Sequence, residues 1–159
     1  MLLEQAQKDF FAENGFLRVP GVLSPEKLRA IQAETDRVVQ AASGVEDHNE
    51  IYDLEASHKP NAPRVRRIKT PHLHFSAFED LVRDTDLTYP VAGLIGEDIR
   101  LYGGKINIKA AGYGAPVEWH QDWAFYPHTN DDVLTVAIML DDMDADNGSL
   151  GIMAGSHKG

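Results

Sequence analysis

The chain has 159 residues, of which 43% are apolar and 25% are charged, proportions that are typical of one soluble globular domain. It carries 15 basic and 25 acidic residues, and the formal net charge of −10 argues against sequence-independent binding to nucleic acid or to an anionic membrane. The absence of cysteine excludes disulfides, thiolate metal sites and thiol nucleophiles from this chain and fits a cytoplasmic protein, which we expect.

The first part of the chain predicts two helices. Residues 2–14 show an amphipathic helical pattern that ends at Gly15, and residues 16–20 alternate in the manner of a short strand. The second helix begins at Ser24-Pro25-Glu26, where the serine can cap the helix and the proline suits the first helical position. Its apolar stripe continues until Gly44, which we expect to end it.

The next residues predict a loop, a strand and two shorter helices. Residues 45–63 are polar and are interpreted as a loop, whereas residues 64–69 (RVRRIK) predict a strand. Residues 76–79 have the residue types of a capping box, which marks the start of a helix. Residues 87–96 predict a further short helix that a proline interrupts.

After Gly96 the pattern changes from helical to strand-like. Short runs rich in Val, Ile and Leu alternate with clusters of Gly, Pro, Asp and Asn. The predicted strands are IRLYGG, KINIKAA, VEWHQDW, VLTVAIML and SLGIM. Helices followed by strands predict an α+β fold with an antiparallel sheet or barrel-like sandwich, and not a doubly wound parallel sheet.

The stretch EWHQDW, residues 118–123, carries both tryptophans of the chain, Trp119 and Trp123, beside a His and an Asp. In a strand, residues i and i+2 point to the same face, so His120 and Asp122 can aim an imidazole and a carboxylate at one point. These two ligands and a second His form the facial triad of non-haem Fe(II) oxygenases. The alternative is a hydrogen-bonded surface pair, because short motifs often match by chance.

Residues 119–159 resemble the phytanoyl-CoA dioxygenase family. They show its H-Q-D motif, an aromatic-Pro segment, a strand, an acidic turn that ends in Asn-Gly, a further strand and the motif GSHKG, in that order and spacing. FFAENGFLRVPGVLSPEKL, residues 10–28, is similar to the opening of the same family. The resemblance implies an Fe(II)- and 2-oxoglutarate-dependent dioxygenase that hydroxylates a small organic molecule with O₂ and releases succinate and CO₂. It also implies a double-stranded β-helix (jelly-roll, cupin-like) core preceded by N-terminal helices.

The resemblance implies roles for particular residues. His120 and Asp122 are the implied catalytic residues and iron ligands. The residues implied to support the 2-oxoglutarate site are Lys69, Lys105 and Gln121. The residues that we expect to line the pocket for a small-molecule substrate are Trp119, Trp123 and His128. The two tryptophans can equally be ordinary aromatic residues of the core or its rim.

Two further features of the family fall outside residues 1–159: a third iron ligand, which is a His downstream of GSHKG, and an Arg that pairs with 2-oxoglutarate. We therefore expect the N-terminal portion of a longer oxygenase domain, with a helical region at 1–97, the first strands of the β-helix at 98–159, and the last strands missing. His157 is expected to have a structural role. Two alternatives are an inactive β-helix module that binds or scaffolds a partner, and a cupin-like metal enzyme with other chemistry.

Overall fold

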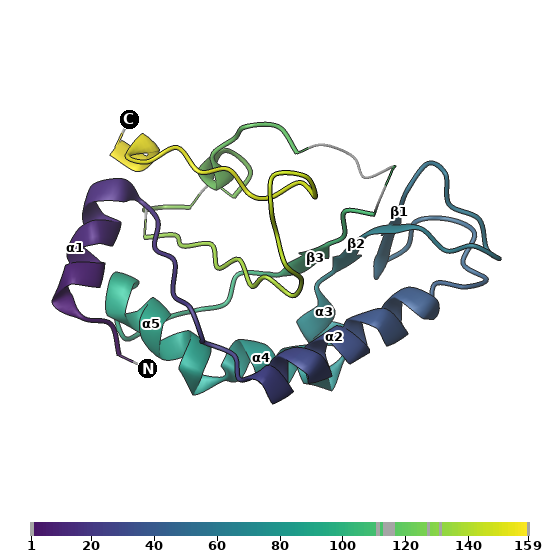
Figure 1. The fold of residues 1–159 in the computed structure, drawn as a ribbon, viewed down its shortest axis with the longest axis horizontal. Helices are drawn as coiled ribbons and strands as arrows, with labels where there is room; N and C mark the ends of the chain where they lie inside the picture. Colours follow the sequence, from purple (N-terminus) through teal and green to yellow (C-terminus); the bar gives the residue numbers. More distant parts are fainter. Residues whose placement is uncertain (1, 111, 113–116, 127, 131, 159) are drawn as a thin grey trace.

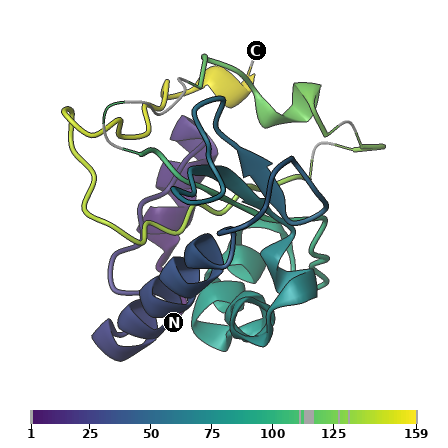
Figure 2. The same ribbon diagram turned by 90° about the vertical axis from the view of Figure 1, so that its right-hand side faces the viewer.

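Helices cover one face of a small sheet in the computed structural model (Figures 1 and 2). The structure describes residues 2–110, 112, 117–126, 128–130 and 132–158. The helices are α1 (Gln5–Asn14), α2 (Pro25–Gln40), α3 (Pro71–His74), α4 (Ser76–Arg83) and α5 (Thr85–Ile95). The strands are β1 (Tyr52–Leu54), β2 (Val65–Lys69) and β3 (Lys105–Asn107), and two 3₁₀ turns are η1 (Asp122–Ala124) and η2 (Ser156–Lys158).

The hydrophobic core lies between α2, α4 and the sheet. Val38 of α2 and Ile68 of β2 are completely buried there, and Phe78 of α4 packs in the same cluster. Complete burial of a side chain of this size stabilises the fold by about 1.5–3 kcal/mol. The predicted apolar stripe of α2 is therefore confirmed. So is its cap, because the Ser24 hydroxyl accepts a hydrogen bond from the Lys27 backbone N–H.

The sheet is antiparallel, in the order β1-β2-β3, and its two faces differ in character. Ile68 pairs with Tyr52 on one side and Ile106 on the other, and these side chains face the core. Because side chains alternate along a strand, the neighbouring positions face away from the core. The opposite face carries polar side chains only: Asp53, Arg67, Lys69, Lys105 and Asn107.

Strand β1 lies within residues 45–63, where the sequence predicted a loop. Its apolar alternation is three residues long and is too short to be recognised without its partner β2. The surrounding loop is held by His58, whose Nδ1 accepts a hydrogen bond from the Arg64 N–H at 2.9 Å. The other ring nitrogen of His58 therefore donates to the Val45 carbonyl, 2.8 Å away.

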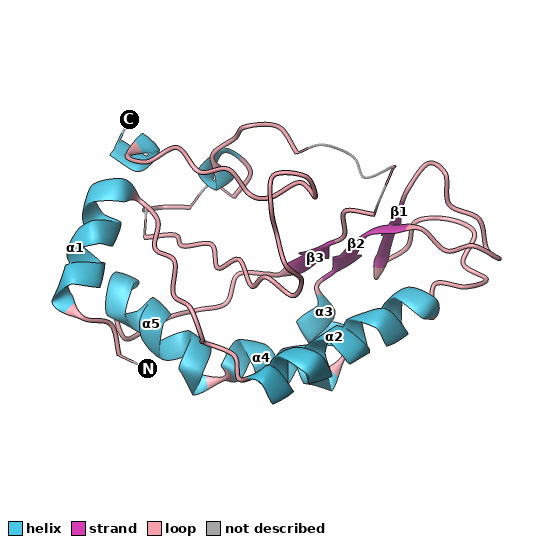
Figure 3. Cartoon of the chain, viewed as in Figure 1, coloured by secondary structure: helices cyan, strands magenta, loops and turns pink. Residues whose placement is uncertain are grey.

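Most strands predicted after Gly96 are wrong, as is the predicted strand at 16–20. Residues 99–104, 117–123, 133–140 and 149–153 contain no paired strand among the described positions, and the described residues of the run at 105–111 form a strand over β3 (Figure 3). A strand requires a neighbour that satisfies its backbone hydrogen bonds. Apolar alternation indicates a face to be buried, but it does not supply that neighbour. Helices and an antiparallel sheet still agree with the predicted α+β class.

The predicted helix starts near residues 76 and 87 need two corrections. Ser76 is the first residue of α4 and does not cap it, because Phe75 occupies the cap position. The last helix, α5, begins earlier than predicted, since the Asp84 carboxylate accepts a hydrogen bond from the Asp86 N–H and caps it. The helix continues through Pro90 to Ile95. No helix in the described part of the chain combines the length and apolar character needed to cross a bilayer.

Helices α2 and α5 are joined by an ion-pair cluster. The Lys27 ammonium lies 2.6 Å from an Asp84 carboxylate oxygen and 3.1 Å from one of Asp86. These hydrogen bonds raise the pKa of Lys27, and the bond from Lys27 lowers the pKa of Asp84. The cluster therefore contributes stability that depends on the charge of Asp84.

We predict that Tyr52→Phe lowers the free energy of unfolding by about 1 kcal/mol, the usual net contribution of one hydrogen bond. The buried Tyr52 hydroxyl donates to the Val38 carbonyl at 2.8 Å, and phenylalanine keeps the ring but loses this donor. Urea unfolding measures the change. Tyr89→Phe, at a tyrosine that is 52% exposed, is the matched control and should change stability by less than about 0.5 kcal/mol. Equal effects of the two substitutions would contradict the prediction.

We predict that Asp84→Asn reduces the loss of stability at acidic pH. Asparagine keeps an oxygen that caps α5 but removes the charge that Lys27 binds. Because the pKa of Asp84 is lowered in the folded state, its contribution is present above about pH 4, the ordinary aspartate value, and is lost as pH falls through the folded value. Urea unfolding at pH 7 and at successively lower pH tests this. Asp80→Asn, at an exposed position of α4, should keep the wild-type pH dependence.

Candidate functional site

His120 and Asp122 form a close pair at the start of η1. The Nε2 atom of His120 lies 3.2 Å from Oδ1 of Asp122. The convergence of these two side chains, which the i, i+2 spacing predicted, is therefore present, but a strand does not produce it. The backbone N–H groups of Phe125 and Tyr126 both donate to the Asp122 carbonyl, at 2.9 and 3.0 Å, and so close a turn.

The Glu118 carbonyl determines which nitrogen of His120 carries the proton. It lies 2.7 Å from Nδ1, and because a carbonyl can only accept, Nδ1 is the donor. In the neutral ring Nε2 then presents a lone pair toward the Asp122 carboxylate. Histidines that bind metals usually donate their other ring N–H to a carbonyl or carboxylate in this way.

The spacing of the two donor atoms fits a metal ion. Two ligands at right angles, each about 2.1 Å from a metal, lie about 3 Å apart, close to the 3.2 Å between His120 and Asp122. A lone pair and a carboxylate at this distance repel each other unless a cation or a proton lies between them. His120 and Asp122 are each about one-third exposed, so a metal ion can reach both.

Thr135 is a residue of this site that the sequence did not indicate. Its hydroxyl donates a hydrogen bond to Oδ2 of Asp122, which leaves Oδ1 directed at His120. Hydrogen bonds of this kind fix the orientation of carboxylate ligands and make metal binding tighter. The only sequence signal was a hydroxyl residue within the apolar run VLTVAIML.

The other histidines do not complete a ligand set. In the described part of the chain, no three or more His, Cys, Asp or Glu side chains are grouped so that they could hold a metal ion. His157 lies against α1, with Nε2 3.2 Å from the Ala12 carbonyl, which supports the structural role expected for it. His72 and His74 belong to α3, where residues two apart do not share a face.

Lys69 and Lys105 are direct neighbours across β2 and β3, on the polar face of the sheet. The Lys69 ammonium lies 3.3 Å from Asp53, whereas the Lys105 ammonium donates to the Tyr126 hydroxyl at 3.1 Å. Like charges directly opposite each other on a ladder are destabilising, so this pair of positions favours an anion beside it. Through Tyr126, Lys105 also connects the sheet to the turn that contains Asp122.

Backbone strain marks the end of β2, directly after Lys69. Thr70 has φ 41° and ψ 49°, which places a β-branched residue in the left-handed region. This conformation costs about 1–3 kcal/mol and is found most often at functional sites. The Thr70 N–H donates to the Gly104 carbonyl at 3.0 Å, and this bond helps to hold the strained residue at the edge of the lysine pair.

Aromatic rings gather next to Lys105. The Tyr102 ring makes edge contacts with Tyr126 at 5.8 Å and with His128 at 4.7 Å, and Trp123 lies 6.1 Å from His128. The structure thus brings together Trp123 and His128, two of the predicted pocket residues, with two tyrosines that the sequence did not indicate. We refer to Tyr102, Trp123, Tyr126 and His128 as the aromatic cluster.

The remaining predicted residues lie apart from the aromatic cluster. The Trp119 side chain is 72% exposed, and its ring lies against Gly151. Gln121 donates from its side-chain amide to the Ser156 carbonyl at 2.8 Å. Of the Gly/Pro loop at 112–116 that precedes the motif, only Gly112 lies within the described residues.

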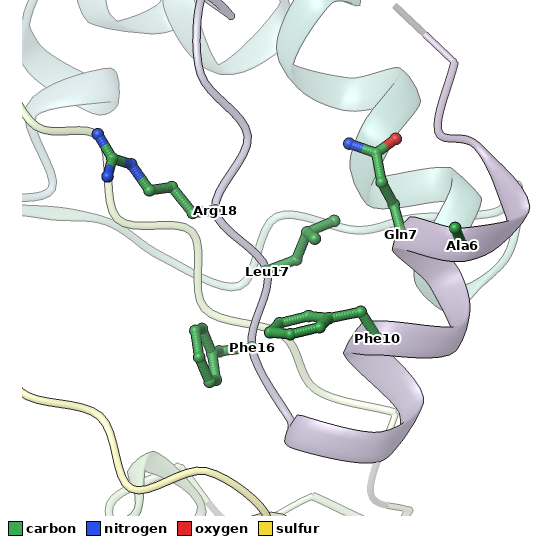
Figure 4. Close-up of a pocket in the computed structure, with 6 residues that line it drawn as sticks. All are labelled: Ala6, Gln7, Phe10, Phe16, Leu17 and Arg18. Atoms are coloured by element: carbon green, nitrogen blue, oxygen red, sulfur yellow. The ribbon is translucent and has the colours of Figure 1, made fainter.

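A separate apolar cleft of about 380 Å³ lies beside α1 (Figure 4). None of the predicted site residues lines it. Its lining consists of Ala6, Gln7, Phe10, Phe16, Leu17 and Arg18. The cleft therefore has no part in the chemistry predicted for His120 and Asp122.

Comparisons with known proteins identify the family of the chain. The phytanoyl-CoA dioxygenase (PhyH) family model matches residues 11–159. A probable alpha-ketoglutarate-dependent hypophosphite dioxygenase from Stutzerimonas stutzeri is 40% identical over 100% of this chain and 54% of the relative. An ectoine dioxygenase from Nocardia farcinica is 29% identical over 96% of this chain and 50% of its own length. The chain thus spans about half the length of the curated relatives it matches.

A solved structure shows the same fold. The crystal structure of EctD from S. alaskensis with bound Fe matches 78% of this chain and 42% of its own, with a TM-score of 0.64 and 18% sequence identity. At this identity the match establishes the shared fold and carries no residue roles.

Proposed function

Because the chain belongs to the phytanoyl-CoA dioxygenase family, we propose that it carries part of the iron and 2-oxoglutarate sites of a dioxygenase that hydroxylates a small molecule. The single observation that carries this proposal is the 3.2 Å approach of His120 Nε2 to Asp122 Oδ1. Both relatives described above are named as dioxygenases, and one is named for its dependence on alpha-ketoglutarate. The likeness to EctD supports a double-stranded β-helix of which the observed sheet is a part.

In this proposal His120 and Asp122 are two of the iron ligands. Iron held there would supply the activation of O₂, with 2-oxoglutarate as the source of electrons and succinate and CO₂ as its products. Glu118 keeps the proton on Nδ1 of His120, so that Nε2 is free to bind. Thr135 keeps one oxygen of Asp122 directed at the same point.

The lysine pair is proposed to bind the carboxylates of 2-oxoglutarate. Lys69 and Lys105 supply two ammonium groups on neighbouring strands, and among the described residues only Lys69 is close to a carboxylate, that of Asp53. The aromatic cluster beside Lys105 is proposed to form one wall of the site. The relatives are named for hypophosphite and ectoine, both small polar molecules, and we propose a substrate of this class.

A second candidate function is a β-helix module that binds without catalysis. One observation favours it: the described residues bring only two ligands, His120 and Asp122, to the site. A full-length protein that folds, binds 2-oxoglutarate and releases no succinate with any small polar substrate would support this second function.

We predict that His120→Ala and Asp122→Ala each reduce iron-dependent succinate release by the full-length protein to background, because each removes one ligand. Thr135→Val should keep a folded protein but weaken Fe(II) binding by about 10–100-fold, the usual effect of losing a group that orients a ligand. Succinate release and anaerobic Fe(II) binding measure these changes. His74→Ala, at an exposed histidine of α3, is the control and should behave like the wild type. Wild-type turnover in either ligand variant would refute the assignment.

We predict that Lys69→Met and Lys105→Met raise the KM for 2-oxoglutarate about tenfold or more while kcat changes less, because each removes a positive charge from the proposed carboxylate site. Steady-state kinetics with varied 2-oxoglutarate tests this. Lys59→Met, at an exposed lysine outside the described site, removes the same charge and should leave the KM unchanged. If all three variants behave alike, general electrostatics and not a defined site explains the effect.

A further inference from the structure

The C-terminal turn η2 contacts the end of α1, which lies far away in the sequence (Figures 1 and 2). The Gly155 N–H donates to the Asn14 carbonyl at 2.8 Å. The His157 ring lies with Nε2 3.2 Å from the Ala12 carbonyl, so Nε2 carries the proton and donates. Two hydrogen bonds therefore attach the GSHK turn to the last residues of α1.

Gly15 is the residue that permits this contact. It ends α1 with φ 78°, in the left-handed region that glycine adopts without strain. A Cβ atom at this position would lie 2.3, 2.6 and 3.0 Å from three atoms of the His157 ring. Phe16 then packs edge-on against Phe10 at 5.4 Å, which closes the end of the helix (Figure 4).

The same turn also contacts the residues of the candidate site. The Gln121 amide donates to the Ser156 carbonyl at 2.8 Å, and Gln121 lies between His120 and Asp122 in the sequence. Residues 117–126 have no strand partner in the described structure, so side-chain contacts must hold them in place. Among the described residues, three side-chain hydrogen bonds connect this segment to distant parts of the chain: Gln121 to Ser156, Thr135 to Asp122, and Lys105 to Tyr126.

We propose that Gly15 and His157 form a dock that holds the GSHK turn in place, and that this turn positions the His120–Asp122 pair through Gln121. Gly15, His157 and Gln121 are thus positioning residues, and none of them binds the metal. The effect on iron rests on the proposed function, whereas the docking itself does not.

The test compares two glycine substitutions, with tryptophan fluorescence recorded on the 159-residue chain and Fe(II) binding measured on the full-length protein. Gly15→Ala introduces both backbone strain and a collision with His157, whereas Gly44→Ala introduces comparable strain at φ 85° with no atom within 4 Å of the new Cβ. Both tryptophans of the chain flank the site, so their fluorescence and its quenching by acrylamide report on residues 118–123. Circular dichroism shows whether each variant keeps its helices.

We expect Gly15→Ala to change the tryptophan emission and quenching and to weaken anaerobic Fe(II) binding about tenfold, while Gly44→Ala changes neither. Gln121→Met, at an exposed position without strain, should reproduce the change in fluorescence if Gly15→Ala fails to fold. Equal fluorescence changes in Gly15→Ala and Gly44→Ala, or no change in Gln121→Met, would refute the proposal that the GSHK turn positions the His120–Asp122 pair.

The two readouts separate this inference from the proposed function. If the wild type binds no Fe(II) but Gly15→Ala alone changes the fluorescence, the docking stands and the proposed function fails. If the wild type binds Fe(II) and Gly15→Ala binds it equally well, the positioning role fails and the iron site stands.

Discussion

The site depends on one contact, in which a histidine nitrogen and a carboxylate oxygen face each other at 3.2 Å. In the neutral ring of His120 both atoms present lone pairs, because the Glu118 carbonyl accepts from the other ring nitrogen. Such a contact is unfavourable in a protein unless a positive charge lies between the two atoms. Glu118 and Thr135 therefore act together, since each holds one of the two groups in an orientation that favours a cation.

The residues that stabilise the fold are different from the residues of the candidate site. The hydrophobic core between α2, α4 and the inner face of the sheet is built from apolar side chains. The outer face of the sheet carries the lysine pair and Asp53. The turn that contains Asp122 lies outside this core and is connected to the sheet through Tyr126 and Lys105. A substitution at the candidate site can therefore change the His120–Asp122 pair without removing the buried side chains that stabilise the fold.

Local sequence patterns predicted the structural features that depend only on residues close together in the chain. The cap at Ser24 and the apolar stripe that follows it predicted α2, because capping and helical periodicity are local properties. The strands predicted at 133–140 and 149–153 are not observed among the described residues, because strand pairing depends on residues that are distant in the sequence. His120 and Asp122 converge as the spacing predicted, because Gln121 between them has an extended backbone, although it belongs to no paired strand. Thr135 and the register of Lys69 with Lys105 depend on long-range contacts that no local pattern encodes.

The most direct measurement of the central claim is an anaerobic titration of the full-length protein with Fe(II) in the presence of 2-oxoglutarate, followed by visible absorbance. If His120 and Asp122 hold the iron, a charge-transfer band between iron and 2-oxoglutarate appears in the wild type and is lost in the double variant His120→Ala/Asp122→Ala. A band of equal intensity in that variant, or no band in the folded wild type, would contradict the assignment of these two residues as iron ligands.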